Sequence, residues 1–159
     1  MPRIGITGHT NLSAATVLLV AAGIREVLAP HSVGLTGVTC LARGADQIFA
    51  RVVLELGGVI EVVLPAHDYR ARKVSADNAA EFDEILTLAR AIRTMPFAHS
   101  DGAAYQAASE HMLSTVDSLI AVWDGRPAGG HGGTADVVAA AHRRGVPVTV
   151  IWPQGAERS

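Results

Sequence analysis

The chain alternates short apolar runs with longer segments in which apolar residues recur at helical spacing. Residues 59–64 and 146–152 are almost continuous in Val, Ile and Leu, which is typical of strands buried on both faces of a parallel sheet. The pattern predicts strands at Arg3–Gly8, Gly34–Leu41, Val59–Leu64, Ala91–Met95, Ser118–Trp123 and Val146–Trp152. We therefore expect an α/β fold: a single-domain, doubly wound, mostly parallel sheet flanked by helices.

Local signals mark the helices between the strands. Ser13 can cap the first helix, Gly57 stops the second, and basic residues before Gly145 end the last. Residues 65–80 are polar and irregular, so we expect a loop there that overhangs a site. Residues 154–159 are expected to be a frayed tail. The predicted helices span about Ser13–Leu28, Ala45–Leu56, Ala79–Ala89 and Thr134–Arg144.

Composition narrows the class of protein. The 159 residues are 49% hydrophobic and 18% charged, which fits one globular domain, expected over residues 1–153. A net charge of −2 creates no strong field for a phosphate backbone or an anionic lipid, so neither nucleic acid nor membrane is an expected partner. Cys40 has no second cysteine to pair with, the N-terminus lacks the features of a signal peptide, and no apolar run reaches about 18 residues. These features predict a cytoplasmic protein.

Two strand-to-helix turns carry candidate binding residues. In a doubly wound sheet, ligands bind beyond the carboxyl ends of the strands, where helix N-termini attract anions. The first turn offers Thr7, Gly8 and His9 to a phosphate or a ribose, and the alternative is a tight turn that caps a helix. The second offers Arg43 beside Gly44, and its alternative is an ion pair between Arg43 and Asp46.

A glycine-rich loop follows the fifth predicted strand and is the strongest local signal. It begins with Asp124 and Gly125 and ends at Thr134, where a helix starts. Backbone N–H groups in such a loop can surround one anion, although glycine-rich loops without ligands also exist. We expect a phosphate-binding loop, with Gly130, Gly132, Gly133 and Thr134 as its contacts.

Several other chemistries lack their motifs. The first turn is not a GxGxxG dinucleotide motif, the lysine of a Walker loop is absent, and no GxSxG elbow occurs. The histidines show no metal-ligand spacing, so we expect no metal. Cys40 is expected to be a small buried hydrophobe.

Two motifs resemble a known superfamily. Residues 41–46, LARGAD, are similar to the GLARGID element of DNA-processing protein A, and residues 130–134 are similar to the PGGxGT loop of the LOG (Lonely Guy) enzymes. The chain thus resembles the Rossmann-like nucleotide-binding proteins that include both groups and the YpsA-like proteins. The resemblance implies a Rossmann-like fold, a phosphate site on Gly132, Gly133 and Thr134, and a homodimer.

The chain departs from the LOG pattern at both catalytic positions. LOG enzymes cleave the N-glycosidic bond of nucleoside monophosphates and continue PGGxGTxxE, but Val137 stands where they carry the glutamate. Their RKxxM arginine and lysine fall on Ala108 and Ser109 when the methionine is aligned with Met112.

Two functions follow as hypotheses. The first is a sensor or binding module for a nucleotide or nucleotide-derived small molecule, not an enzyme, with no other cofactor expected. The alternative is a nucleotide-processing hydrolase, acting on an N-glycosidic or phosphate bond through Asp136, Asp124 or Glu110.

Overall fold

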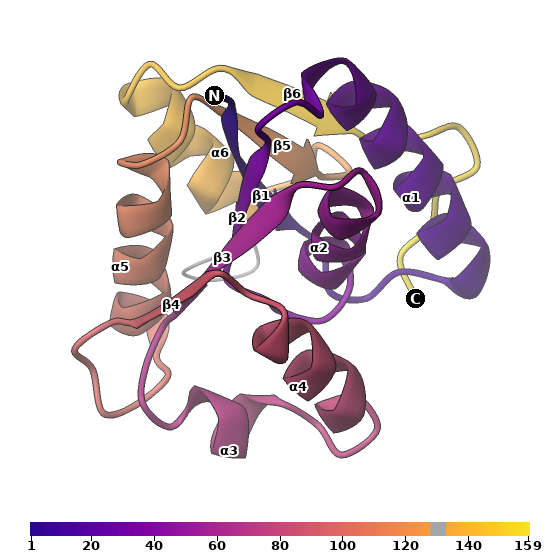
Figure 1. Ribbon diagram of the computed structural model, residues 1–159. Coiled ribbons are helices and arrows are strands. Elements are labelled where there is room, and N and C mark those ends of the chain that lie inside the picture. The colour runs from indigo at the N-terminus through magenta and orange to yellow at the C-terminus, as the bar shows by residue number, and fades with distance from the viewer. Residues whose placement is uncertain (128–132) are drawn as a thin grey trace.

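Six parallel strands form one sheet in the order β4-β3-β2-β1-β5-β6 (Figure 1). The computed structural model describes residues 1–127 and 133–159. The sheet confirms the predicted doubly wound α/β fold, and its strands are shorter than or equal to the predicted ones. They are β1 (Arg3–Gly8), β2 (Thr36–Thr39), β3 (Val59–Leu64), β4 (Ala91–Thr94), β5 (Ser118–Val122) and β6 (Val148–Ile151).

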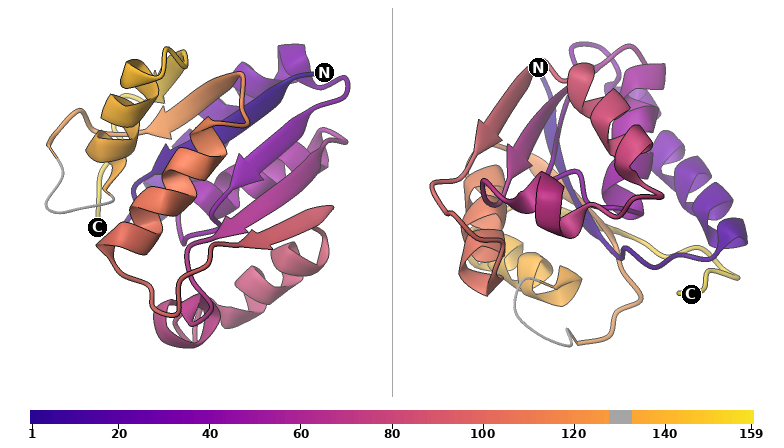
Figure 2. Two further views of the ribbon diagram at one scale, coloured as in Figure 1. Left: turned by 90° about the vertical axis from the view of Figure 1, so that its left-hand side faces the viewer. Right: turned by 90° about the horizontal axis from the view of Figure 1, so that it is seen from below.

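Helices cover both faces of the sheet (Figures 1 and 2). One core packs side chains of α1 (Ala14–Leu28), α2 (Ala45–Glu55) and α4 (Ala79–Thr87) against the strands. A second core packs α5 (Gly102–Leu113) and α6 (Thr134–Arg143) on the opposite face. Two short helices, η1 (Ala29–His31) and α3 (Tyr69–Lys73), complete the described elements.

The winding direction of the chain reverses between β1 and β5. From β1 the chain passes through β2 and β3 to β4 at one edge, and α5 then returns it to β5 on the other side of β1. The loops at the carboxyl ends of β1 and β5 consequently separate, because the connections that follow them lead to opposite faces. Such a reversal is where doubly wound proteins bind ligands.

Side-chain caps fix where helices begin. The N–H of Thr16 donates to Ser13 Oγ at 3.2 Å, which confirms the predicted cap of α1. The N–H of Ala104 donates to Asp101 Oδ1 at 3.0 Å and sets the start of α5, the helix on which the LOG alignment places Ala108.

Two expectations about the chain need correction. The polar segment 65–80 contains α3, whose Tyr69 is buried against the core and so folds five residues into a helical turn. The tail is paired, not frayed. Arg158 forms an antiparallel bridge with Leu12, and the Ser159 N–H donates to the carbonyl of Asn11 at 2.9 Å.

One helical segment also differs from the expectation on membrane spans. Residues Ala14–His31, with a mean hydropathy of 1.3, are long and apolar enough to cross a membrane by length and composition alone. In the fold this segment connects β1 with β2, and Val20, Ile24 and Leu28 are fully buried in the core. In this fold it is therefore a core helix of the α/β sandwich.

Candidate functional site

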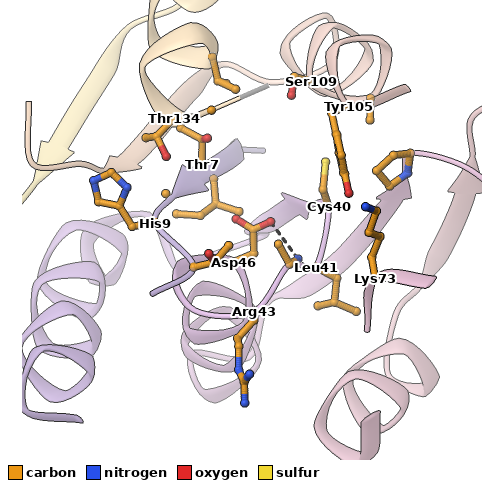
Figure 3. A pocket seen from close by; sticks show the side chains of 18 of the residues that line it. Thr7, His9, Cys40, Leu41, Arg43, Asp46, Lys73, Tyr105, Ser109 and Thr134 are labelled. Atoms are coloured by element: carbon orange, nitrogen blue, oxygen red, sulfur yellow. Dashed lines mark hydrogen bonds between the residues drawn. The ribbon is translucent and has the colours of Figure 1, made fainter. Parts of the chain in front are cut away.

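A cavity of about 570 Å³ lies at the carboxyl ends of the central strands. Its walls come from the loops after β1 and β2, from α5, and from the start of α6. Figure 3 shows Thr7 and Thr134 on one side, Tyr105 and Lys73 on the other, and Asp46 between them. The volume is within the range of small-molecule sites, about 300–1,000 Å³.

The end of β1 combines a packing glycine with a buried histidine. A Cβ on Gly8 would lie 2.5 Å from the Cβ of Ala45 and 2.8 Å from that of Val122, so glycine is needed for α2 and β5 to approach this strand. Burial lowers the pKa of His9, which keeps the ring neutral at neutral pH. Its Nε2 accepts a hydrogen bond from the Asp124 N–H at 3.1 Å, although the Asp124 carboxylate is also within 3.3 Å.

The loop after β2 is held in a tight conformation. Leu41 has a φ of 61° and Gly44 a φ of 83°, both in the left-handed region. The N–H of Leu41 donates to Thr39 Oγ1 at 2.9 Å, and the N–H of Ala45 donates to the carbonyl of His9 at 3.2 Å. The loop therefore fixes the start of α2 against the first turn.

Asp46, in the first turn of α2, is a site residue for which the sequence suggested only a structural role. The side chain lines the cavity, and the residue is 6% exposed. Its Oδ2 accepts from the Ala42 N–H at 3.1 Å. Burial raises the pKa of this carboxyl to about 7, against the smaller opposing effect of that hydrogen bond. Among the residues that the structure describes, it is the one acidic side chain in the cavity lining.

Arg43 lines the cavity but makes a different ion pair from the one considered as its alternative. Its guanidinium donates to Asp77 Oδ2 at 2.6 Å, and no pair with Asp46 forms. The side chain is about half exposed, and in Figure 3 it points away from the centre of the cavity. Asp77 precedes α4, so this pair ties the loop after β2 to the segment between α3 and α4.

The predicted phosphate loop is only partly described. Gly130 and Gly132 lie outside the described residues. Gly133 is the N-cap of α6, with a φ of −71°, and Thr134 is buried at the first position of the helix. Both line the cavity, as do Thr7, Gly8 and His9.

Three predicted site residues lie outside the cavity lining. Gly44 contacts the backbone of the first turn instead, and Gly125 turns the chain with a φ of 82°. Asp124 accepts from the Arg126 N–H at 3.0 Å, a bond that is the largest cause of the lowered pKa of its carboxyl. Each of these three residues thus contributes to the backbone conformation or to a local hydrogen bond, and none of them lines the cavity.

The aromatic wall could not be assigned from local motifs. The chain has two tyrosines, and both Tyr69 and Tyr105 line the cavity, with ring centroids 6.4 Å apart in an edge-to-face arrangement. Burial raises the pKa of both hydroxyls, so both are neutral hydrogen-bond donors. Cys40 lies beside them, partly buried, and desolvation raises the pKa of its thiol. Aromatic scarcity, at 4% of residues, is the one sequence signal that could have drawn attention to the tyrosines.

The positions aligned with LOG catalytic residues do face the site. Val137, Ala108 and Ser109 all line the cavity, so the missing glutamate and arginine would have pointed into it. The acidic residues considered for the hydrolase do not line it: Glu110 is paired with Arg144, whose Nε donates to it at 2.7 Å, and Asp136 is exposed on α6.

Comparison with known proteins gives likenesses of structure. No protein-family model and no curated protein matches the sequence. DNA processing protein A (DprA) of Streptococcus pneumoniae superposes with a TM-score of 0.69 at 16% identity, over 97% of this chain and 51% of that protein. The chain thus spans about half the length of DprA.

Two further solved proteins share the fold. The molybdenum cofactor binding protein of the phototrophic bacterium Rippkaea orientalis superposes with a TM-score of 0.60 at 18% identity, over 94% of this chain and 75% of that one. The Moco carrier protein of Chlamydomonas reinhardtii gives a TM-score of 0.57 at 20% identity, again over 94% and 75%. These likenesses confirm the Rossmann-like fold that the sequence motifs predicted, including the structural resemblance to DNA-processing protein A.

Proposed function

We propose that this protein binds a small ligand of the nucleotide class in the cavity, with a phosphate at the start of α6, and that it acts as a binding module. The observation that carries the proposal is the meeting of Thr7, Gly133 and Thr134 with an aromatic wall in one cavity at the sheet reversal. The first N–H groups of a helix have no partner within the helix and bear a partial positive charge. A bound phosphate accepts hydrogen bonds from these N–H groups and is attracted by their partial positive charge.

The walls suit the rest of such a ligand. Tyr105 offers a flat apolar surface against which a heterocycle can pack, and Lys73 adds a cation at the exposed rim. Arg43 was predicted from the sequence as a phosphate contact, but it pairs with Asp77 and points away from the centre of the cavity, so we place the phosphate at the start of α6 and not on Arg43.

Two solved relatives in fold support a small-molecule ligand. The Rippkaea protein is described as binding the molybdenum cofactor and the Chlamydomonas protein as its carrier. At 18% and 20% identity they share the fold with this chain, so they support the ligand's size class and not its identity.

The pKa and the position of Asp46 support the alternative function, a hydrolase, which therefore needs a test. A carboxyl with a pKa near 7 is suited to proton transfer at neutral pH, and this one faces the cavity. A hydrolase built on this site would therefore use Asp46 and not Asp124, Asp136 or Glu110. Measurement of turnover separates the two functions.

Gly133→Asp tests the phosphate site. Gly133 has a φ of −71°, which any residue can adopt, and aspartate is a favourable helix N-cap, so the variant should fold. The added carboxylate stands where the phosphate is proposed to bind, and we expect nucleotide binding to fall below detection in titration calorimetry.

Gly133→Asn is the matched control, because asparagine has nearly the same shape and caps helices as well as aspartate but carries no charge. We expect it to bind nucleotide more tightly than Gly133→Asp does. Melting temperatures of both variants report folding. Nucleotide affinity equal to that of the unmodified protein in both variants would exclude a phosphate at the start of α6.

A further inference from the structure

The environment of Asp46 is unusual for a buried carboxyl. Buried charges in proteins are normally paired with a cation or held by several hydrogen bonds. Among the described residues, Asp46 has a single hydrogen bond, from the Ala42 N–H to Oδ2, although the residue is 94% buried. Arg43 is engaged by Asp77 and does not compensate it. One side of the carboxyl group thus faces the cavity with acceptor capacity to spare (Figure 3).

A carboxylate selects particular chemical groups. When ionised it accepts hydrogen bonds and donates none, and it repels a phosphate. The group that meets the ionised form of Asp46 is therefore a hydrogen-bond donor, and the phosphate must bind elsewhere in the cavity. The start of α6 is the anion site of the proposed function.

The sheet order fixes how far apart these two positions lie. Asp46 follows β2 and Thr134 follows β5, and β1 lies between the two strands. Neighbouring strands are about 4.8 Å apart, so β2 and β5 lie two strand spacings, about 10 Å, apart. A ribose 5-phosphate, with a hydrogen bond of about 3 Å at each end, bridges a distance of that order between its phosphate and its hydroxyl groups. Beyond Asp46, over β2 and β3, lie Cys40 and Tyr105, where a base would extend.

We propose that Asp46 accepts hydrogen bonds from the 2′- and 3′-hydroxyls of a ribose whose 5′-phosphate binds at the start of α6. This inference rests on the proposed function and narrows it: the ligand is a ribonucleoside 5′-phosphate or a derivative, and deoxyribonucleotides bind more weakly. Two neighbouring hydroxyls suit a carboxylate because both can donate to it, as in other nucleotide-binding α/β folds. Removal of a hydroxyl leaves a buried charged acceptor without that donor.

The first test uses the unmodified protein. Titration calorimetry compares AMP, GMP, CMP and UMP with their 2′-deoxy and 3′-deoxy forms, and ribose 5-phosphate with 2-deoxyribose 5-phosphate. We expect each missing hydroxyl to weaken binding about tenfold or more. Equal affinity for ribose and deoxyribose forms would overturn the inference, as would discrimination that follows the base and ignores the sugar.

The second test uses Asp46→Asn. Asparagine keeps one oxygen that can accept from the Ala42 N–H, but an NH₂ donor replaces the other acceptor oxygen. We expect the preference for ribose over deoxyribose to disappear in this variant. Asp83→Asn is the control, because that aspartate is exposed, pairs with Arg70 and lies away from the cavity, so the preference should persist. A preference retained in Asp46→Asn would overturn the role given to this residue.

The two proposals fail in different ways. Nucleotides that bind through Gly133 without distinguishing ribose from deoxyribose would leave the proposed function standing and remove Asp46 from sugar recognition. Absence of binding by any of the four ribonucleotides and by ribose 5-phosphate would overturn both. Circular dichroism tests whether Asp46→Asn is folded, and the series of deoxy ligands decides the question without any variant.

Discussion

At the residue scale, the carboxyl group of Asp46 affects the pKa of neighbouring groups, and its own pKa is raised as well. Burial is the main cause of the raised pKa of the Cys40 thiol and of the Tyr69 hydroxyl, and the nearby charge on Asp46 raises both further. Both groups are therefore uncharged through the neutral range. Asp46 itself has a pKa of about 7, against an ordinary value of 3.8, so it is the member of this group that changes charge near neutrality.

Asp46→Asn should stabilise the ligand-free protein more at pH 8 than at pH 5. The pKa of Asp46 is higher in the folded protein than in the unfolded chain. The contribution of this carboxyl to the free energy of unfolding is therefore fully present below about pH 4 and is lost as the pH rises through about 7. Asparagine carries no charge to bury, so the variant avoids that loss, which could reach about 4 kcal/mol. Melting curves at pH 5, 6, 7 and 8 give the difference, with Asp83→Asn as reference. A difference between Asp46→Asn and the unmodified protein that stays constant across these pH values would contradict the raised pKa.

At the element scale, the loop between β2 and α2 depends on a glycine that the sequence assigned to ligand binding. Gly44 has a φ of 83°, and a Cβ there would lie 2.6 Å from the carbonyl oxygen of His9. Gly57, just after α2, has nearly the same φ, 81°, but a Cβ there would meet nothing within 4 Å. The two glycines therefore separate the cost of backbone conformation from the cost of close approach.

Gly57→Ala should destabilise the protein by about 1–2 kcal/mol, the cost of a left-handed conformation for a residue with a side chain. Gly44→Ala should lose that amount and a further 1–3 kcal/mol, roughly, because its methyl group collides with backbone that cannot move aside. Urea unfolding of both variants measures the difference. Equal losses would show that the loop relaxes around the methyl group and that Gly44 is not needed for close packing.

Most elements were predictable because their signals are local. Val59–Leu64 and Arg3–Gly8 are apolar runs bounded by turn residues, and both strands occur where the sequence predicts them. The helix α3 was missed because it is five residues long and one buried tyrosine holds it in place. The tail was expected to fray because its partner, the segment around Leu12, is distant in the sequence and no local pattern shows the pairing.

At the scale of the whole molecule, the sequence predicted which strand ends surround the cavity but not which side chains pair there. The carboxyl ends of β1, β2 and β5 could be expected to converge, since parallel strands present their turns at one edge. The partner of Arg43 could not be expected, because Asp77 is 34 residues away and belongs to a different connection. Likewise, the sequence shows Asp46 only as an acidic residue in the first turn of a predicted helix. The folded structure is needed to show that its carboxyl is buried in the cavity.

The assembled site also predicts the absence of LOG-type turnover. Val137 and Ala108 line the cavity at the positions where the LOG enzymes carry glutamate and arginine, so the cavity wall there holds neither a proton-transfer group nor a cation. Each positioned acid or base commonly contributes about 10²–10⁴-fold to a rate, and the loss of both leaves little rate to detect. We expect no release of free base or ribose 5-phosphate when AMP, GMP, CMP or UMP is incubated with the protein and the products are separated by chromatography. Release at about 1 s⁻¹ or faster would instead show an enzyme with a different catalytic set. In that case loss of the activity in Asp46→Asn, with its retention in Asp83→Asn, would identify Asp46 as part of it.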